Sequence, residues 1–108
     1  MAWIYLFIAG LMEIGWPLGL KYSQTPGTHR ILWIVFAVIS MAASGAFLWL
    51  AQKTIPMGTA YAIWTGIGAI GAFVLGIFLF KDPATFFRIV SATFIVLGII
   101  GLKLSGNS

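Results

Sequence analysis

The chain has 108 residues, of which 61% are hydrophobic and 7% charged, and its mean hydropathy is +1.07. A soluble fold of this length exposes much of its surface to water, so this composition excludes a soluble domain. The chain has no cysteine, which excludes disulfides and cysteine-based metal sites. The net charge of +4 comes from six Lys and Arg residues that all fall at the ends of apolar runs. We interpret them as cations that flank a membrane, and we expect no nucleic-acid partner.

Four apolar runs follow one another, at about 3–21, 31–51, 57–80 and 86–104, and each is long enough to span a bilayer. Short breaks with turn residues separate them, as in YSQTPGTHR, QKTIP and KDPAT. Because the runs are continuously apolar and do not alternate, they predict helices and not the strands of a barrel. We therefore expect an all-α integral membrane protein with a single four-helix domain over 1–108. We also expect the first run to be retained and not cleaved as a signal peptide.

The cations are divided unequally between the two sides of these runs. Four flank one side and two flank the other: Lys21, Arg30, Lys81 and Arg88 against Lys53 and Lys103. The positive-inside rule then favours a cytoplasmic position for the first and third loops. The excess is small, so insertion in both orientations stays open.

Glu13 interrupts the first apolar run and is one of only two acidic residues in the chain. At helical rise it lies roughly 15 Å from one end of its run and 12 Å from the other, near the middle of a bilayer core about 30 Å thick. An ionisable group at that depth costs about 2.5–3.5 kcal/mol. Gly10 and Pro17 share its stripe, and because Pro17 has no N–H the main-chain carbonyl of Glu13 loses its helical partner. We expect a polar cavity here, with an ordinary helix kink as the alternative at Pro17.

The second and third runs place polar side chains at a similar depth. The second run is apolar except for Ser40 and Ser44, and Ser44 lies roughly 12 Å from its end. In the third run Tyr61 and Trp64 are helical neighbours, and Trp64 is again roughly 12 Å deep. A buried indole or phenol needs a partner for its N–H or O–H. A serine that bonds back to its own helix is the alternative for Ser44. We predict Glu13 as the residue that binds substrate or proton, surrounded by Trp16, Ser44, Tyr61 and Trp64.

The fourth run has no polar group at the level of Glu13. It carries a stripe of small residues, Ser91, Gly98, Gly101 and Ser105. Small residues let membrane helices approach closely, so this stripe is a candidate dimer interface. Four helices are too few to enclose a pathway with two gates, and we therefore expect an oligomer.

A carboxyl in a dry site is penalised when charged, so it holds a proton when empty and releases it when a cation arrives. Such a shared site is the minimal machinery of proton-coupled antiport. The sequence lacks a phosphate-binding loop, a metal-ligand cluster and a Ser-His-Asp set, which disfavours ATP-driven transport, a cofactor and enzymatic chemistry. A carboxylate suits guanidinium through paired hydrogen bonds, whereas aromatic faces suit a quaternary ammonium ion. The residues alone leave both ligands open.

The whole chain resembles the small multidrug resistance family, and more narrowly its guanidinium-exporter subtype. The resemblance rests on Glu13 with Trp16, on Leu20 and Lys21, and on KTIPMGTAYAIWTGIGAIGA at 53–72. It implies an antiparallel homodimer, inserted in both orientations in the bacterial inner membrane, that exchanges guanidinium for protons by alternating access. It also implies that the fourth run forms the main dimer contact. The family's central glutamate falls on Glu13, its polar network on Trp16, Ser44, Tyr61 and Trp64, and its lateral portal near Met41 and Gly45.

Three positions depart from the pattern of this subtype. Gly15 and Pro17 stand where the subtype usually has larger or helix-favouring residues, and Gly45 is small for a portal. The extra room would admit alkylated guanidiniums or small quaternary ammonium ions. The competing hypotheses are an exporter of quaternary ammonium or polyaromatic cations, an accessory membrane subunit in which Glu13 bonds a partner helix, and a passive cation channel.

Overall fold

The structure is a computed structural model that describes residues 1–105. It contains four helices: α1 (Ala2–Ser23), α2 (Arg30–Ala51), α3 (Met57–Phe80) and α4 (Phe86–Ser105). Each is long and apolar enough to cross a membrane. The prediction of an all-α chain with four such helices is therefore confirmed. Helix α1 begins one residue earlier and ends two residues later than the run expected at 3–21.

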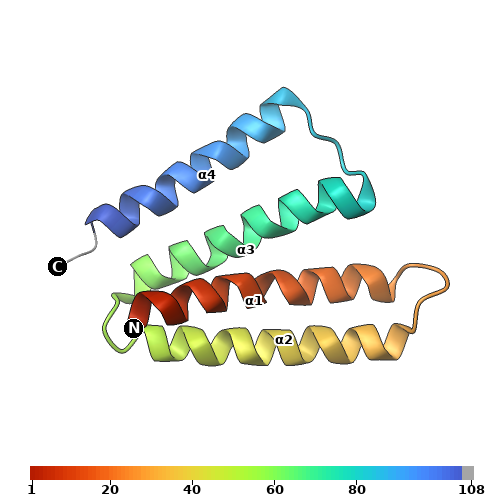
Figure 1. Ribbon diagram of the computed structural model, residues 1–108, viewed down its shortest axis with the longest axis horizontal. Helices are drawn as coiled ribbons and strands as arrows, with labels where there is room; N and C mark the ends of the chain where they lie inside the picture. Colours follow the sequence, from red (N-terminus) through yellow and green to blue (C-terminus); the bar gives the residue numbers. More distant parts are fainter. Residues whose placement is uncertain (106–108) are drawn as a thin grey trace.

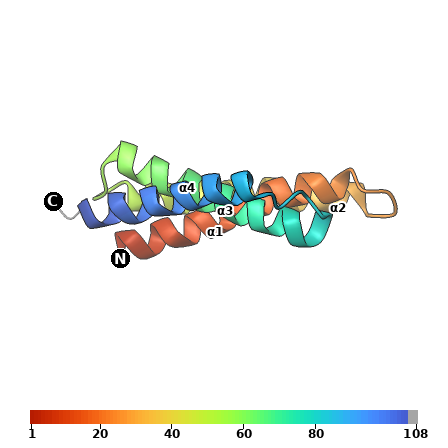
Figure 2. The same cartoon turned by 90° about the horizontal axis from the view of Figure 1, so that it is seen from above.

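The helices lie side by side in the order α2, α1, α3, α4 (Figure 1). They form a thin layer with extents of 49 × 34 × 16 Å, which is seen edge-on in Figure 2. Helix α1 packs against both α2 and α3, whereas α4 packs mainly against α3 and touches α1 through Lys103 over the ring of Trp3. Helix α4 has no buried residue. Helix α1 therefore holds α2 and α3 together, and α4 forms the outer edge of the layer beside α3.

Small residues allow α1 to approach its two neighbours closely. A Cβ on Gly19 of α1 would lie 3.1 Å from the Cβ of Ala37 on α2, and one on Gly10 would lie 2.7 Å from the Cβ of Ile67 on α3. Close backbone approach of this kind is the usual way that membrane helices gain packing contacts. Pro17 lies inside α1, which stays helical through it.

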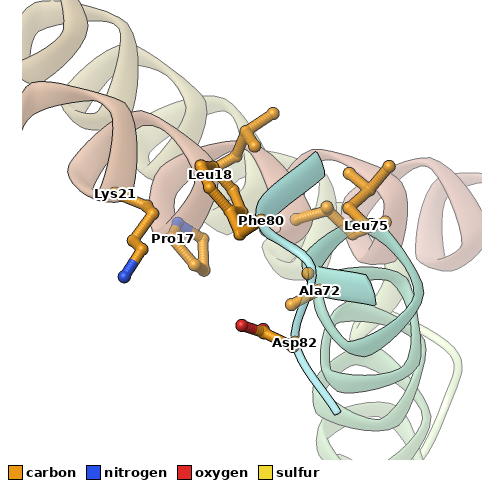
Figure 3. Close-up of a pocket in the computed structure, with 9 residues that line it drawn as sticks. Pro17, Leu18, Lys21, Ala72, Leu75, Phe80 and Asp82 are labelled. Carbon is orange, nitrogen blue, oxygen red and sulfur yellow. The ribbon is translucent and has the colours of Figure 1, made fainter. Parts of the chain in front are cut away.

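At one end of the layer, a cavity of about 190 Å³ lies between α1 and α3 (Figure 3). Apolar side chains such as Leu75 and Phe80 line it, together with two charged residues, Lys21 and Asp82. The turn after α3 places Asp82 there: Lys81 adopts a left-handed conformation at φ 57°, and the Asp82 N–H donates to the Gly76 carbonyl at 3.1 Å. The Lys81 N–H donates to the same carbonyl, so both N–H groups of this left-handed turn close the end of α3.

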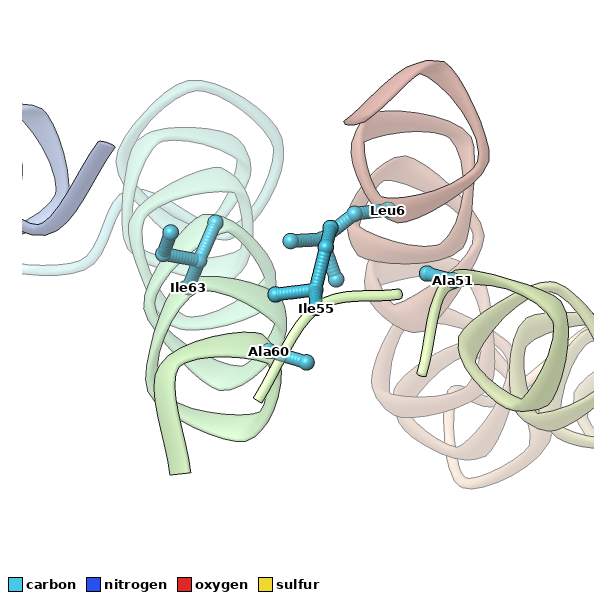
Figure 4. Packing of buried hydrophobic residues seen from close by; sticks show 5 residues of the cluster. All are labelled: Leu6, Ala51, Ile55, Ala60 and Ile63. Atoms are coloured by element: carbon cyan, nitrogen blue, oxygen red, sulfur yellow. The ribbon is translucent and has the colours of Figure 1, made fainter. Parts of the chain in front are cut away.

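At the opposite end, a small apolar core joins the start of α1, the end of α2 and the start of α3 (Figure 4). Its buried members are Leu6, Ala51, Ile55, Ala60 and Ile63. Ile55 belongs to the short connection between α2 and α3, so this connection is tied to α1 by packing. The core fixes the three helices at the end nearest the polar residues described below.

Four of the six cations lie over aromatic rings near the helix ends. The distances from the cationic group to the ring centroid are 4.5 Å for Lys103 over Trp3, 5.0 Å for Lys53 over Trp49, 5.4 Å for Arg88 over Phe73 and 5.7 Å for Lys21 over Phe80. Such pairs keep the charge at the membrane boundary while the apolar stem packs on the protein. This placement agrees with membrane-flanking cations.

Candidate functional site

A chain of two hydrogen bonds joins α3, α2 and α1. The Trp64 indole N–H donates to the Ser44 hydroxyl oxygen at 2.8 Å, and that hydroxyl donates to the Ala9 main-chain carbonyl at 2.6 Å. Ser44 is fully buried. Its hydroxyl thus crosses to α1 instead of bonding back to α2. The half-buried indole of Trp64 thus finds its acceptor on a side chain from another helix.

Glu13 lies one helical turn beyond Ala9 on α1, and its side chain is half-buried. Its Cγ lies 2.5 Å from the position that a Cβ on Gly68 would take. Gly68 is one turn beyond Trp64 on α3, so the missing side chain at residue 68 leaves the room that Glu13 fills. The hydrogen bonds that join Trp64, Ser44 and Ala9 do not include the Glu13 carboxylate, which has no hydrogen-bond partner among residues 1–105.

The other two members of the expected network differ in position. The Tyr61 ring lies 5.5 Å from that of Trp64, centroid to centroid, and Tyr61 is 56% exposed in the single chain. Trp16 is half-buried on α1 and takes no part in the hydrogen bonds or ring contacts of this cluster. The structure therefore brings Ser44, Tyr61 and Trp64 together, places Glu13 one turn away, and leaves Trp16 apart from them.

The residues expected to shape a pocket or portal fall into two groups. Gly10 is buried between α1 and α3, and Pro17 lines the cavity shown in Figure 3. Met41 and Gly45 are exposed on α2, and a Cβ on Gly45 would meet no atom within 4 Å. The first pair therefore packs within the chain, whereas the second pair lies on an open surface of α2.

The four small residues of α4 are all exposed in the single chain. A Cβ on Gly98 or Gly101 would meet no atom within 4 Å. The hydroxyls of Ser91 and Ser105 donate to carbonyls of their own helix, at 2.9 and 3.2 Å. These serines have no polar contact with another helix among residues 1–105.

Two features of this region are not apparent from the sequence alone. The first is the room that Gly68 leaves for Glu13, for which the sequence offers one signal, the spacing of one turn from Trp64. The second is Asp82, whose N–H donates at the end of α3 and which also lines the cavity beside Lys21. Because the Lys21 ammonium lies at the same cavity, a cation placed there would meet a like charge.

Four helices that can each span a membrane, with a carboxylate on α1 one turn from the half-buried Trp64 indole and the buried Ser44 hydroxyl, define a small multi-pass membrane protein. The sequence profile of the family described as Small Multidrug Resistance protein matches residues 1–97. The chain belongs to this family, as its motifs indicated. It is a multi-pass protein of the bacterial inner membrane and not an enzyme.

Several curated proteins are similar to this chain over nearly its whole length. A protein of Escherichia coli (strain K12) named Guanidinium exporter is 53% identical over 105 residues, covering 97% of this chain and 98% of that protein. Proteins with the same name from Yersinia pseudotuberculosis and Salmonella typhimurium are each 51% identical, covering 97% and 99% of this chain and 99% and 100% of their own.

Proposed function

We propose that this chain exports guanidinium in exchange for protons, with Glu13 as the residue that binds one or the other. The observation that carries the proposal is a carboxylate without a partner in the described residues, one turn from the hydrogen-bonded Trp64 and Ser44. The relatives named Guanidinium exporter, at 51–53% identity, support the choice of substrate.

The chemistry of the site suits a planar cation with several N–H donors. A carboxylate accepts two parallel hydrogen bonds from one edge of guanidinium. Ser44 already accepts from Trp64 and donates to Ala9, so its oxygen keeps one lone pair for a further N–H. Proton and cation compete for Glu13. If the transporter switches between its inward-open and outward-open states only when one of them is bound, the proton gradient is coupled to the cation gradient.

We propose further that two copies assemble as an antiparallel homodimer and that the chain inserts in both orientations. Helix α4 supports this assembly because it packs mainly on α3 and buries no residue, and because Gly98 and Gly101 lie open on its surface. The weak division of four cations against two supports the double orientation. In such a dimer the two Glu13 carboxyls would serve one substrate pathway, with the exposed Met41 and Gly45 of α2 as its lateral portal.

The test is transport by the purified protein in liposomes, recorded as currents on a solid-supported membrane while guanidinium is applied. We expect a guanidinium current in the wild-type protein and a reversal of net flux when an imposed pH gradient is reversed. Absence of a guanidinium current would exclude the proposal. Flux that ignores the pH gradient would support a passive channel instead.

A second candidate function, export of quaternary ammonium cations, is favoured by the aromatic pair of Tyr61 and Trp64. Their ring centroids are 5.5 Å apart, and Tyr61 is 56% exposed in the single chain, so its face is available to a cation. The same liposomes test it with tetramethylammonium, a bulky polyaromatic cation and a methylated guanidinium. A current with the quaternary or polyaromatic ions that exceeds the guanidinium current would favour this candidate.

A further inference from the structure

The three residues joined by hydrogen bonds, Ala9, Ser44 and Trp64, have equivalents one helical turn away on the same helices. Helices α1 and α3 run parallel and α2 runs antiparallel to them (Figure 1). Moving one turn therefore takes Ala9 to Glu13, Trp64 to Gly68, and Ser44 to Ser40. The contact of Glu13 with Gly68 confirms this correspondence between α1 and α3.

Ser40 meets α1 at the level of Glu13. Its hydroxyl oxygen lies 2.6 Å from the position that a Cβ on Gly15 would take, so it lies directly against the α1 backbone. Only glycine at residue 15 leaves this space for the hydroxyl. Thr93 and Ser91 bond back to their own helix, whereas the Ser40 hydroxyl makes no hydrogen bond to any group among residues 1–105, so its donor is unused. No buried side-chain oxygen or nitrogen in the described part of the chain lacks a partner, so the Ser40 hydroxyl keeps some accessible surface.

The α1 backbone carries an acceptor at this level that needs a donor. Pro17 has no N–H, so the Glu13 carbonyl lacks the helical bond that every preceding carbonyl of α1 can form. An unpaired carbonyl away from water destabilises the fold. One turn earlier, the Ala9 carbonyl receives the hydroxyl of Ser44. The register places Ser40 opposite Glu13 in the same way.

We propose that Ser40 is a positioning residue of the Glu13 site, whose unused hydroxyl turns from its place beside Gly15 to donate to the main-chain carbonyl that Pro17 leaves free. This bond holds the turn of α1 between Glu13 and Pro17 in place and so fixes the carboxylate relative to Gly68 and Trp64. The three residues act together. Pro17 leaves the Glu13 carbonyl without its helical N–H, Gly15 leaves space beside α1, and Ser40 supplies the hydroxyl that donates to the carbonyl. The role in substrate binding rests on the proposed function, whereas the hydrogen bond itself does not.

The bond is measured directly on the Glu13 carbonyl. Glu13 is the only glutamate in the chain, so cell-free synthesis with glutamate labelled with ¹³C at its main-chain carbonyl marks this one group. Infrared spectra of the protein in bilayers then report its hydrogen bonding. We expect Ser40→Ala to raise the frequency of the labelled band, and Thr93→Ala to leave it unchanged. In the Pro17→Ala background residue 17 regains its N–H, so Ser40→Ala should no longer move the band.

The functional role is measured by a double-mutant cycle in liposomes. With Pro17 present, loss of one hydrogen bond by Ser40→Ala should raise the KM for guanidinium about three- to tenfold, with the maximal rate nearly unchanged. Ser40→Thr keeps the hydroxyl and should restore the KM. With Pro17→Ala, Ser40→Ala should change the KM less than about twofold, because the carbonyl already has a donor.

If Ser40→Ala does not shift the labelled carbonyl band in the protein that keeps Pro17, the proposed hydrogen bond does not exist. A rise of the KM that is equal in both backgrounds would overturn the positioning role and indicate a packing effect of Ser40. If the wild-type protein carries no guanidinium current at all, the proposed function fails, and the infrared result still decides whether Ser40 binds the carbonyl.

Discussion

The side chain of Glu13 occupies the space that a side chain on Gly68 would fill. Its Cγ lies 2.5 Å from the position of a Cβ at residue 68, which is closer than two carbon atoms can approach. The Glu13 side chain thus lies between α1 and α3 because glycine at residue 68 leaves space for it on the facing helix. Position 68 therefore controls where the carboxylate lies, although it has no polar group.

Gly68→Ala should move Glu13 and reduce guanidinium transport by about tenfold or more, because a small misplacement of a binding group is costly to function. Liposome flux at saturating and at low guanidinium measures the effect. Gly58→Ala is the matched control, since a Cβ there would meet no atom within 4 Å, and it should keep wild-type flux. Equal flux in the two variants would contradict the proposed position of Glu13.

Ser44→Ala should leave both the Trp64 N–H and the Ala9 carbonyl without their observed partners. The Ala9 carbonyl keeps its helical bond within α1, whereas the Trp64 N–H loses its acceptor, which costs about 1–3 kcal/mol. The free energy of unfolding should therefore fall by about that amount. Unfolding in mixed micelles, followed by tryptophan fluorescence, measures this change. Thr93→Ala removes a hydroxyl that bonds only within α4 and should lower the free energy by less than about 1 kcal/mol. A loss in Ser44→Ala no greater than in Thr93→Ala would show that the three-helix connection is not formed.

Glu13→Gln keeps the shape of the side chain and removes its charge and its exchangeable proton. We expect a folded protein of unchanged oligomeric state that no longer couples guanidinium flux to a pH gradient, because an amide cannot alternate between proton and cation. Size-exclusion chromatography and liposome currents together give both readouts. Lost assembly with Glu13→Gln would support the accessory-subunit hypothesis.

Gly98→Ile adds a large side chain on α4 where the single chain has no atom within 4 Å. If a second copy packs on this face, the substitution should raise the dissociation constant of the dimer by about tenfold or more, because close helix contact needs small residues. Single-molecule energy transfer in lipid vesicles measures the equilibrium. Gly58→Ile, at another open position, should leave it unchanged; a dimer insensitive to Gly98→Ile would place the interface elsewhere.

Insertion in both orientations can be tested because the chain has no cysteine. Gln24 and Thr54 are exposed at opposite ends of the layer, so Gln24→Cys and Thr54→Cys provide one thiol at each end. We expect each variant to react about half with an impermeant thiol reagent outside intact cells and half only after permeabilisation. Complete labelling of one variant from a single side would show one fixed orientation.

The four helices and the prediction of a role for Glu13 follow from the sequence alone, because length, apolarity and a lone charge in an apolar run are local properties. The depth of Ser44 and Trp64 is equally local, since it follows from helical rise. Which side chains meet depends instead on the order and rotation of the helices, which packing across their surfaces decides. Only the tertiary structure therefore shows that Ser44 bonds α1, that Trp16 lies apart from Trp64, and that Gly68 makes room for Glu13.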